Sequence, residues 1–266
     1  MKKIISFLIA ALSALVPFAQ PESEEIKLPV IMYHHISEKG SLLNEYVITP
    51  EEFESDIAYL KDHGYHSVLP SQIESGNIPE NPVMITFDDG FLSNYKYALP
   101  ILEKYSMTAV CAVIGSLVKE YTENPNTVSD CAYMDTDTVK KMAESGIFEI
   151  ACHTYNMHST SGRKGCAKMK EESDAEYRAA LTQDLTKFNE LYETTMGAST
   201  DIIAFPYGAY SKDTVHIASD AGYKIFLTCE EKVNAISTHN DYPLVLGRYN
   251  RPHGISSESF FDKMDI

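Results

Sequence analysis

The hydrophobic pattern of this chain alternates between short apolar runs and longer amphipathic segments. Apolar or β-branched runs of strand length predict strands at residues 28–36, 67–69, 83–87, 108–114, 147–152, 201–205, 224–228 and 244–248. Helical periodicity with capping residues predicts helices at residues 50–63, 93–105, 135–144, 174–195 and 211–221. Strands and helices that alternate in this way form parallel βαβ units. We therefore expect an α/β fold, a distorted or incomplete (β/α) barrel of about seven to eight strands, with its site at the C-terminal ends of the strands.

Two connecting segments, residues 118–134 and 155–173, are longer than a simple connection requires. Long loops in a compact domain often carry function. We expect both to form the rim of a site.

The N-terminus predicts a secretory signal. Met1, Lys2 and Lys3 precede an apolar run that reaches Ala19, which is the order of charge and hydrophobicity in a signal peptide. The run is shorter than the ~20 apolar residues of a membrane-spanning helix, so we expect no stable membrane span. We assign a signal peptide to residues 1–20, a linker to 21–27 and one domain to 28–266. The expected location is secreted, or the extracellular face of the cell envelope.

Length and charge narrow the class of partner. A chain of 266 residues suffices for one large domain, and α/β barrels commonly take this length. The formal net charge is −16, and no basic patch recurs along the sequence. Both features argue against nucleic acid or an anionic membrane surface as a partner. A neutral or cationic polymer fits better, and we expect a monomer.

The five cysteines match no zinc motif. Cys111, Cys152 and Cys229 lie in apolar runs, where a small buried residue is expected. Cys131 and Cys166 lie in polar loops, and the sequence leaves open whether they pair.

Two adjacent carboxylates directly follow one of the predicted strands. The strand at 83–87 runs directly into Asp88, Asp89 and Gly90. In an α/β fold the C-terminal end of a strand borders the site, so one carboxylate could bind a metal while the other takes a proton from water. The alternative is a solvated turn, for which Asp-Asp-Gly is also typical.

Two histidines follow the predicted strand at 147–152. His153 and His158 are five positions apart and would point ~140° apart on one helix, so only a loop brings them together. Together with Asp89 they form two imidazoles and one carboxylate. This ligand set predicts a divalent metal site with an open position, most simply Zn²⁺. A structural role for each histidine is the alternative.

Residues Phe205, Pro206, Tyr207 and Gly208 stand at another strand end. The backbone N–H of Tyr207 could stabilise an oxyanion, and its ring could pack on a sugar. A rigid aromatic turn would explain the same residues without function.

The first predicted strand carries Tyr33, His34 and His35. One histidine could protonate a leaving amine. Because side chains alternate along a strand, we expect only one of them to face the site, and the pattern does not choose between them. A capping or core histidine is the alternative.

These motifs, in this order, resemble those of the polysaccharide deacetylases, carbohydrate esterase family four, over residues 28–250. Most of that family spaces the two histidines four apart and places an arginine two residues before the motif proline. Here the spacing is five, position 204 is alanine, and the family's late histidine motif is missing, since only His253 follows Arg248.

The departures resemble one subset, the poly-β-1,6-N-acetylglucosamine deacetylases. That subset has the spacing of five, lacks the arginine and takes its general acid from an early Tyr-His, which selects His34 over His35. Arg248 and Arg251 remain the two candidates to replace the arginine.

The resemblance implies N-deacetylation of an N-acetylglucosamine polysaccharide by a catalytic domain at residues 28–266. Asp88 would act as general base on the attacking water, the Tyr207 N–H would stabilise the oxyanion, and His34 would protonate the amine. The implied metal ligands are Asp89, His153 and His158. The expected substrate-binding residues, which belong to these motifs or adjoin them, are Pro206, Tyr155 and Tyr33.

Two other functions remain open. The same site could cleave O-acetyl esters on xylan or other glycans, because an ester needs less activation than an amide. The chain could also be a non-catalytic carbohydrate-binding module on a degenerate esterase scaffold, although a binding module has no evident need for Asp88.

Overall fold

The computed structural model describes residues 25–266, so the predicted signal peptide lies outside the described residues. Strand β1 (Ile26–Leu28) pairs antiparallel with β11 (Asn234–Ile236). Residues 26 and 27, which the sequence places in a linker, therefore belong to the folded domain.

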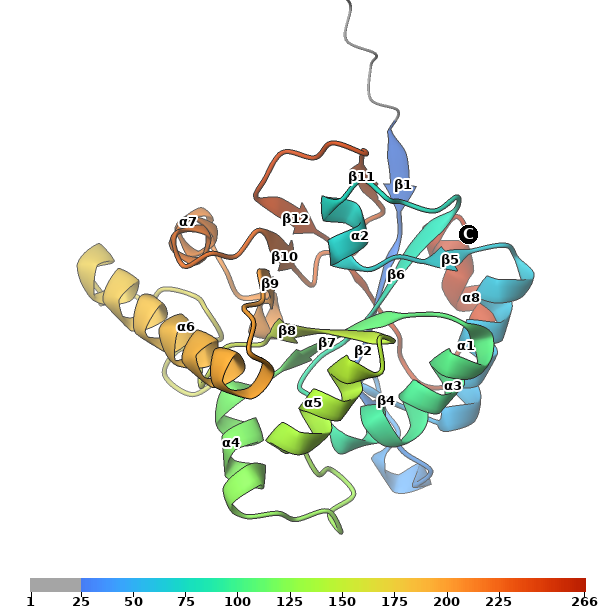
Figure 1. Cartoon of the computed structure of the whole chain (residues 1–266), viewed down its shortest axis with the longest axis horizontal. Helices are drawn as coiled ribbons and strands as arrows, with labels where there is room; N and C mark the ends of the chain where they lie inside the picture. The colour runs from blue at the N-terminus through green and yellow to red at the C-terminus, as the bar shows by residue number, and fades with distance from the viewer. Residues whose placement is uncertain (1–24) are drawn as a thin grey trace, which may run out of the picture.

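The centre of the molecule is a curled parallel sheet with helices outside it (Figure 1). All neighbours in this sheet are parallel. The strand order is β12 (Leu244–Leu246), β10 (Ile225–Leu227), β9 (Ile202–Ala204), β8 (Phe148–Cys152), β7 (Ala109–Val113), β6 (Pro82–Phe87), β2 (Val30–Tyr33) and β13 (Tyr249–Asn250). These eight parallel strands confirm the predicted incomplete (β/α) barrel.

The two edge strands of the sheet are close neighbours along the chain. Strands β12 and β13 are separated only by Gly247 and Arg248. Because β12 pairs with β10 and β13 pairs with β2, the segment 244–250 runs from one edge of the sheet to the other. A Cβ at Gly247 would lie 2.3 Å from the Glu230 carbonyl oxygen, so only glycine fits this crossing. Arg248 is thereby placed at the seam, fully buried.

The helices cover the outer face of the sheet (Figure 1). Helix α1 begins with a capping box, in which Thr49 Oγ1 accepts from the Glu52 N–H and the Glu52 side chain accepts from the Thr49 N–H. Pro50 at the first helical position also favours a helix start here. The helices are α1 (Pro50–Asp62), α2 (Pro70–Glu74), α3 (Leu99–Tyr105), α4 (Gly115–Glu123), α5 (Thr136–Glu144), α6 (Asp174–Met196), α7 (Lys212–Asp220) and α8 (Ser257–Phe261).

Shorter elements connect these helices and strands. They are β3 (His35–Ile36), β4 (Val47–Ile48), β5 (His66–Ser67), the π-helical turn Asn94–Ala98, and the 3₁₀ turns Gly40–Leu42, Pro206–Gly208 and Asp262–Met264. The predicted strand at 28–36 is divided among β1, β2 and β3, and the predicted loop at 118–134 begins inside helix α4.

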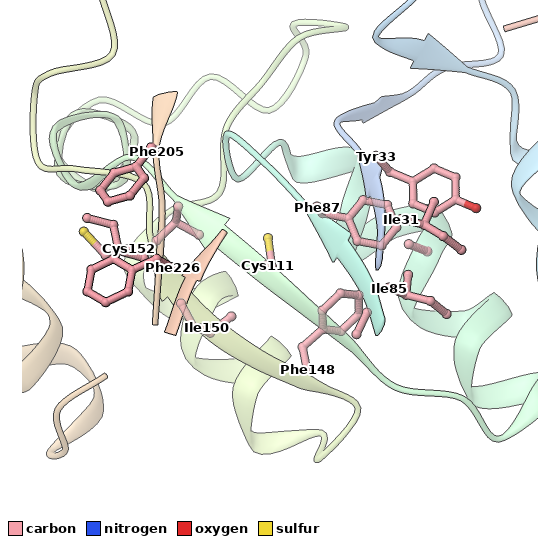
Figure 2. Close-up of a cluster of buried hydrophobic side chains, with 14 of the residues drawn as sticks. Ile31, Tyr33, Ile85, Phe87, Cys111, Phe148, Ile150, Cys152, Phe205 and Phe226 are labelled. Atoms are coloured by element: carbon pink, nitrogen blue, oxygen red, sulfur yellow. The ribbon is translucent and has the colours of Figure 1, made fainter. Parts of the chain in front are cut away.

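Side-chain alternation on β6 separates an outer core from the barrel interior. Val83, Ile85 and Phe87 pack in the outer core between sheet and helices. Met84 belongs to a second cluster of small and aliphatic side chains, which fills the barrel interior. Figure 2 shows the outer core, to which Cys111 and Cys152 contribute as expected for buried cysteines. The same expectation is wrong for Cys229, which is exposed.

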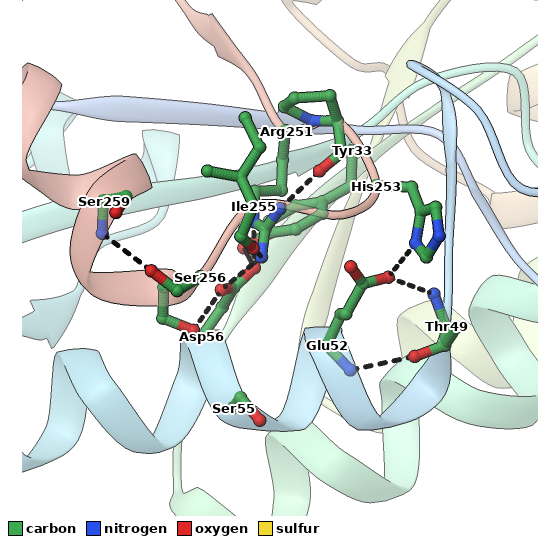
Figure 3. A network of polar contacts seen from close by, with 12 residues as sticks. Tyr33, Thr49, Glu52, Ser55, Asp56, Arg251, His253, Ile255, Ser256 and Ser259 are labelled. Carbon is green, nitrogen blue, oxygen red and sulfur yellow. Dashed lines mark hydrogen bonds and ion pairs between the residues drawn. The ribbon is translucent and has the colours of Figure 1, made fainter.

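A buried polar network ties the C-terminal segment to helix α1 (Figure 3). Arg251 donates from Nε to Asp56 Oδ2 at 2.8 Å and from Nη2 to Asp56 Oδ1 at 3.1 Å. Tyr33 and Ser257 donate their hydroxyl protons to the same carboxylate. Both ions of this pair are buried, so removing either one would leave an uncompensated buried charge and destabilise the fold.

All five cysteines are free thiols. Cys166 is buried and Cys131 is exposed, so the two do not form the disulfide that the sequence left undecided. Within residues 25–266, no helix combines the length and the apolar character that crossing a membrane requires.

Candidate active site

A pocket of about 680 Å³ opens at the C-terminal ends of the strands. It gathers six of the nine predicted site residues from the segments that follow four strands, β2, β6, β8 and β9. Its walls include His34, Asp88, Asp89, His153, His158 and Tyr207.

Asp88 is held at the base of this pocket by Arg248. Arg248 donates from Nη1 to Asp88 Oδ1 at 2.7 Å and from Nη2 to Asp88 Oδ2 at 2.8 Å. Burial alone would raise the pKa of Asp88, but the adjacent guanidinium outweighs it and lowers that pKa below its usual value. Asp88 is therefore ionised at neutral pH, as a general base must be.

Arg248 is itself fixed by neutral partners. Its Nε donates to the Thr228 carbonyl at 2.9 Å, and Nη1 also donates to Thr86 Oγ1 at 3.2 Å. Arg251, the other candidate to replace the missing arginine, is engaged by Asp56. The structure thus resolves the alternative in favour of Arg248.

Asp89, His153 and His158 converge in the way that a metal site requires. Asp89 Oδ1 lies 3.4 Å from His153 Nε2 and 3.1 Å from His158 Nε2. One ligand atom from each of the three residues lies within 4.8 Å of the others, so the set could hold a metal ion. Asp89 Oδ1 is buried and has no well-formed hydrogen bond within the described part of the chain. An orphaned carboxylate oxygen that faces two imidazole nitrogens fits a divalent cation.

The surroundings orient these ligands. His153 donates from Nδ1 to the Ala204 carbonyl at 2.9 Å, which leaves Nε2, the nitrogen that faces Asp89, as the one that could bind a metal. His158 Nδ1 lies 3.1 Å from the Tyr207 hydroxyl. Burial would raise the pKa of Asp89, but the two imidazoles lower it well below its usual range. Asp89 has φ 74°, a strained left-handed conformation of the kind found at functional sites.

Both His34 and His35 line the pocket, which corrects the expectation that only one could. Strand β2 ends at Tyr33 and β3 begins at His35, so regular alternation is interrupted at His34. His35 is buried, with Nδ1 2.8 Å from Ser93 Oγ. His34 packs edge-on against Tyr46, and burial lowers its pKa although Asp88 and Asp89 oppose this. A histidine without a side-chain tether suits proton transfer better than one held by Ser93.

Tyr207 contributes an exposed aromatic wall. Its side chain is 41% exposed, its ring centroid lies 4.6 Å from that of His158, and its φ is 58°. The assignment of the Tyr207 N–H to an oxyanion stays a prediction.

Three predicted substrate-binding residues do not reach the pocket. Tyr33 is 1% exposed, points into the outer core and donates to Asp56, because alternation on β2 turns it toward the helices (Figures 2 and 3). Pro206 is buried beneath its turn. Tyr155 lies on the outer side of its loop, against Lys187 of α6. The structure therefore corrects the assignment of Tyr33, and it places Pro206 and Tyr155 outside the pocket walls.

Tyr46 is a wall residue that the sequence did not reveal. It is 48% exposed and lines the pocket beside His34. Its one sequence signal is an aromatic residue in a polar segment between predicted elements, which is too common to be informative.

An ionised carboxylate lies beside an Asp-His-His set at the C-terminal ends of parallel strands. This arrangement is typical of hydrolases built on an α/β barrel. A sequence model of the polysaccharide deacetylase family matches residues 75–226. The chain belongs to this family, which confirms the resemblance seen in the motifs.

Individual relatives agree with this assignment. YxkH of Bacillus subtilis is 29% identical over 209 residues, which are 77% of this chain and 65% of YxkH. The poly-β-1,6-N-acetyl-D-glucosamine N-deacetylase of Staphylococcus aureus is 29% identical over 205 residues, 75% of this chain and 67% of the relative. This chain thus spans about two thirds of the length of each. In fold it is similar to a de-N-acetylase of Aggregatibacter actinomycetemcomitans, with a TM-score of 0.72, 24% identity and coverage of 90% of this chain and 98% of that one.

Proposed function

We propose that this protein is a metal-dependent hydrolase that removes N-acetyl groups from an N-acetylglucosamine-containing polysaccharide. The observation that carries the proposal is the ionised Asp88 held by Arg248 beside the Asp89, His153 and His158 set in one pocket. The similarity to a poly-β-1,6-N-acetyl-D-glucosamine N-deacetylase supports the β-1,6-linked polymer as substrate. The predicted signal peptide supports a secreted or envelope location as part of this proposal.

The three ligands favour zinc, since two imidazoles, one carboxylate and an open position are typical of catalytic zinc sites. When bound, the ion would supply Lewis-acid polarisation of the acetyl carbonyl and lower the pKa of water. His153 would bind through Nε2, because its Nδ1 proton is committed to the Ala204 carbonyl.

The protein's own groups account for the proton transfers. Asp88 accepts a proton from the attacking water; its carboxylate retains lone pairs after accepting from Arg248. His34 donates a proton to the departing amine, which would otherwise leave as an unstable anion. The Tyr207 N–H would stabilise the developing oxyanion. The exposed rings of Tyr46 and Tyr207 offer apolar surfaces for the sugar.

Acetate release from N-acetylglucosamine oligomers of β-1,6 and β-1,4 linkage tests this proposal. We expect release from the β-1,6 oligomer that stops with chelator and returns with added zinc. The Asp88→Asn variant, treated in the same way, controls for contaminating hydrolases. If zinc-loaded protein releases no acetate from either oligomer, the N-deacetylase proposal is wrong, and release from acetylated xylan in the same assay would identify an esterase.

A further inference from the structure

The backbone between the two histidine ligands is tied to helix α6 by a single carboxylate. Asp184 Oδ1 accepts from the Tyr155 N–H and Asp184 Oδ2 from the Asn156 N–H, each at 2.8 Å. We propose that Asp184 is a positioning residue for the metal site, because it holds the loop 153–158 in the shape that directs both imidazoles at Asp89. This inference rests on the metal site of the proposed function.

The loop depends on outside partners because its own conformation is irregular. Thr154 has φ 68°, a left-handed conformation that costs free energy for a residue with a β-branched side chain. Its hydroxyl accepts from the Met157 N–H at 3.1 Å, which closes the turn toward His158. A loop of this kind persists only where its surroundings hold it.

The inner side of the loop is held by the start of helix α4. The Gly115 N–H donates to the Thr154 carbonyl at 3.0 Å, and the Ser116 N–H donates to the Tyr155 carbonyl at 2.7 Å. A Cβ at Gly115 would lie 2.9 Å from Tyr155 Cδ2, so the two segments pack too closely for any other residue. These contacts occupy carbonyl groups, and they leave the N–H groups of residues 155 and 156 to be paired from the other side.

Asp184 pairs these two N–H groups from an otherwise apolar stripe of helix α6. It is 8% exposed and lies on the buried face of α6 with Leu181, Leu185 and Phe188. A carboxylate in such a stripe is unfavourable unless it is hydrogen-bonded. An ionised carboxylate has two acceptor oxygens and no donor, so it can accept from two successive N–H groups at once. No neutral side chain offers two such acceptor oxygens.

The five-residue spacing of the histidines explains why this support is needed. His153 is fixed by the strands on either side of β8, since its N–H donates to the Val113 carbonyl of β7 and its Nδ1 to the Ala204 carbonyl of β9. His158 lies beyond the turn and reaches Asp89 only if residues 154–157 keep their path. Asp184 acts on the middle of that path without contacting either imidazole or the substrate pocket.

The test is zinc affinity, measured without substrate by competition with a chromogenic chelator. Asp184→Ala should raise the zinc Kd by about 10- to 100-fold, the usual effect of losing a partner that orients a ligand. Asp184→Asn should fall between the wild type and Asp184→Ala, because its amide keeps one acceptor and turns a donor toward the second N–H. Faster hydrogen exchange at Tyr155 and Asn156 should accompany both changes.

Arg178→Ala is the control on the same helix. Arg178 donates to Asp220 of α7, so its loss removes an ion pair of α6 that does not reach the loop and should leave zinc affinity unchanged. All proteins are compared at a temperature where each is folded, and Asp184→Asn serves if Asp184→Ala does not fold. A folded Asp184 variant with a zinc Kd within twofold of the wild type overturns the proposal. Wild-type protein that binds zinc but releases no acetate contradicts only the proposed function, whereas wild-type protein that binds no zinc contradicts both.

Discussion

Arg248 donates one hydrogen bond to each carboxylate oxygen of Asp88, and both side chains are buried. The two residues come from opposite regions of the sequence, 160 positions apart. The common form of the family places an arginine two residues before the motif proline, where this chain has Ala204. Here a guanidinium reaches Asp88 from the seam between β12 and β13 instead, and it lowers the pKa of that carboxylate.

Arg248→Lys should move the acid limb of the pH–rate profile to higher pH. A lysine keeps the charge but loses the two-point contact, so it lowers the pKa of Asp88 less, and the base becomes protonated at a higher pH than in the wild type. The pH dependence of kcat/KM measures this directly. Arg251→Lys, which weakens the other buried ion pair, is the control and should leave the acid limb in place. An unchanged limb in Arg248→Lys would show that Arg248 does not set the pKa of the base.

Asp88→Asn and His153→Ala should separate base catalysis from metal binding. The first should retain zinc and lose about 10²- to 10⁴-fold in kcat, the usual contribution of a general base. The second should lose zinc, because one of the three ligands is removed. Metal content by elemental analysis, together with acetate release, checks both. Near wild-type turnover in Asp88→Asn, or full zinc occupancy in His153→Ala, would contradict the respective assignment.

His34→Ala should impair amide substrates far more than activated esters. Protonation by His34 matters when the leaving group is a sugar amine, but an aryl oxide leaves without help. We expect about a 10²-fold or larger loss of kcat on the N-acetylated oligomer and a much smaller loss on an aryl acetate. His35→Ala, a change at the neighbouring wall position, should show no such difference between substrates. Equal losses on both substrates in His34→Ala would remove it as the general acid.

The pair Asp88–Arg248 should stabilise the fold above about pH 4 and lose this effect in acid. The pKa of Asp88 is lowered in the folded state, whereas the unfolded chain has the usual value of about 3.9. The contribution is therefore fully present above the unfolded pKa and disappears as pH falls through the folded pKa. Urea unfolding of chelator-treated protein at pH 7, 5, 4 and 3 should show that the stability difference between the wild type and Asp88→Asn shrinks toward pH 3. A difference that stays constant with pH would mean that ionisation of Asp88 does not stabilise the fold.

The sequence by itself determined which segments form the barrel and at which strand ends the candidate site residues lie. Apolar runs and helical periodicity are local signals, so they located the strand that carries Asp88 and the strand that leads to His153. Parallel βαβ units place all C-terminal strand ends on one side, and the structure brings Asp88, Asp89, His153 and His158 into one pocket there.

Only the tertiary structure decided the partners that orient these groups. The choice of Arg248 over Arg251 depends on how segment 244–250 crosses the seam, and the contact from Asp184 depends on how helix α6 packs beside the ligand loop. His35 shows the same limit locally, because a break in the strand at His34 turned it toward the pocket, although regular alternation would have placed it on the outer face with Tyr33. Periodicity describes neighbours along the chain, whereas these contacts join side chains distant in sequence whose meeting is set by packing.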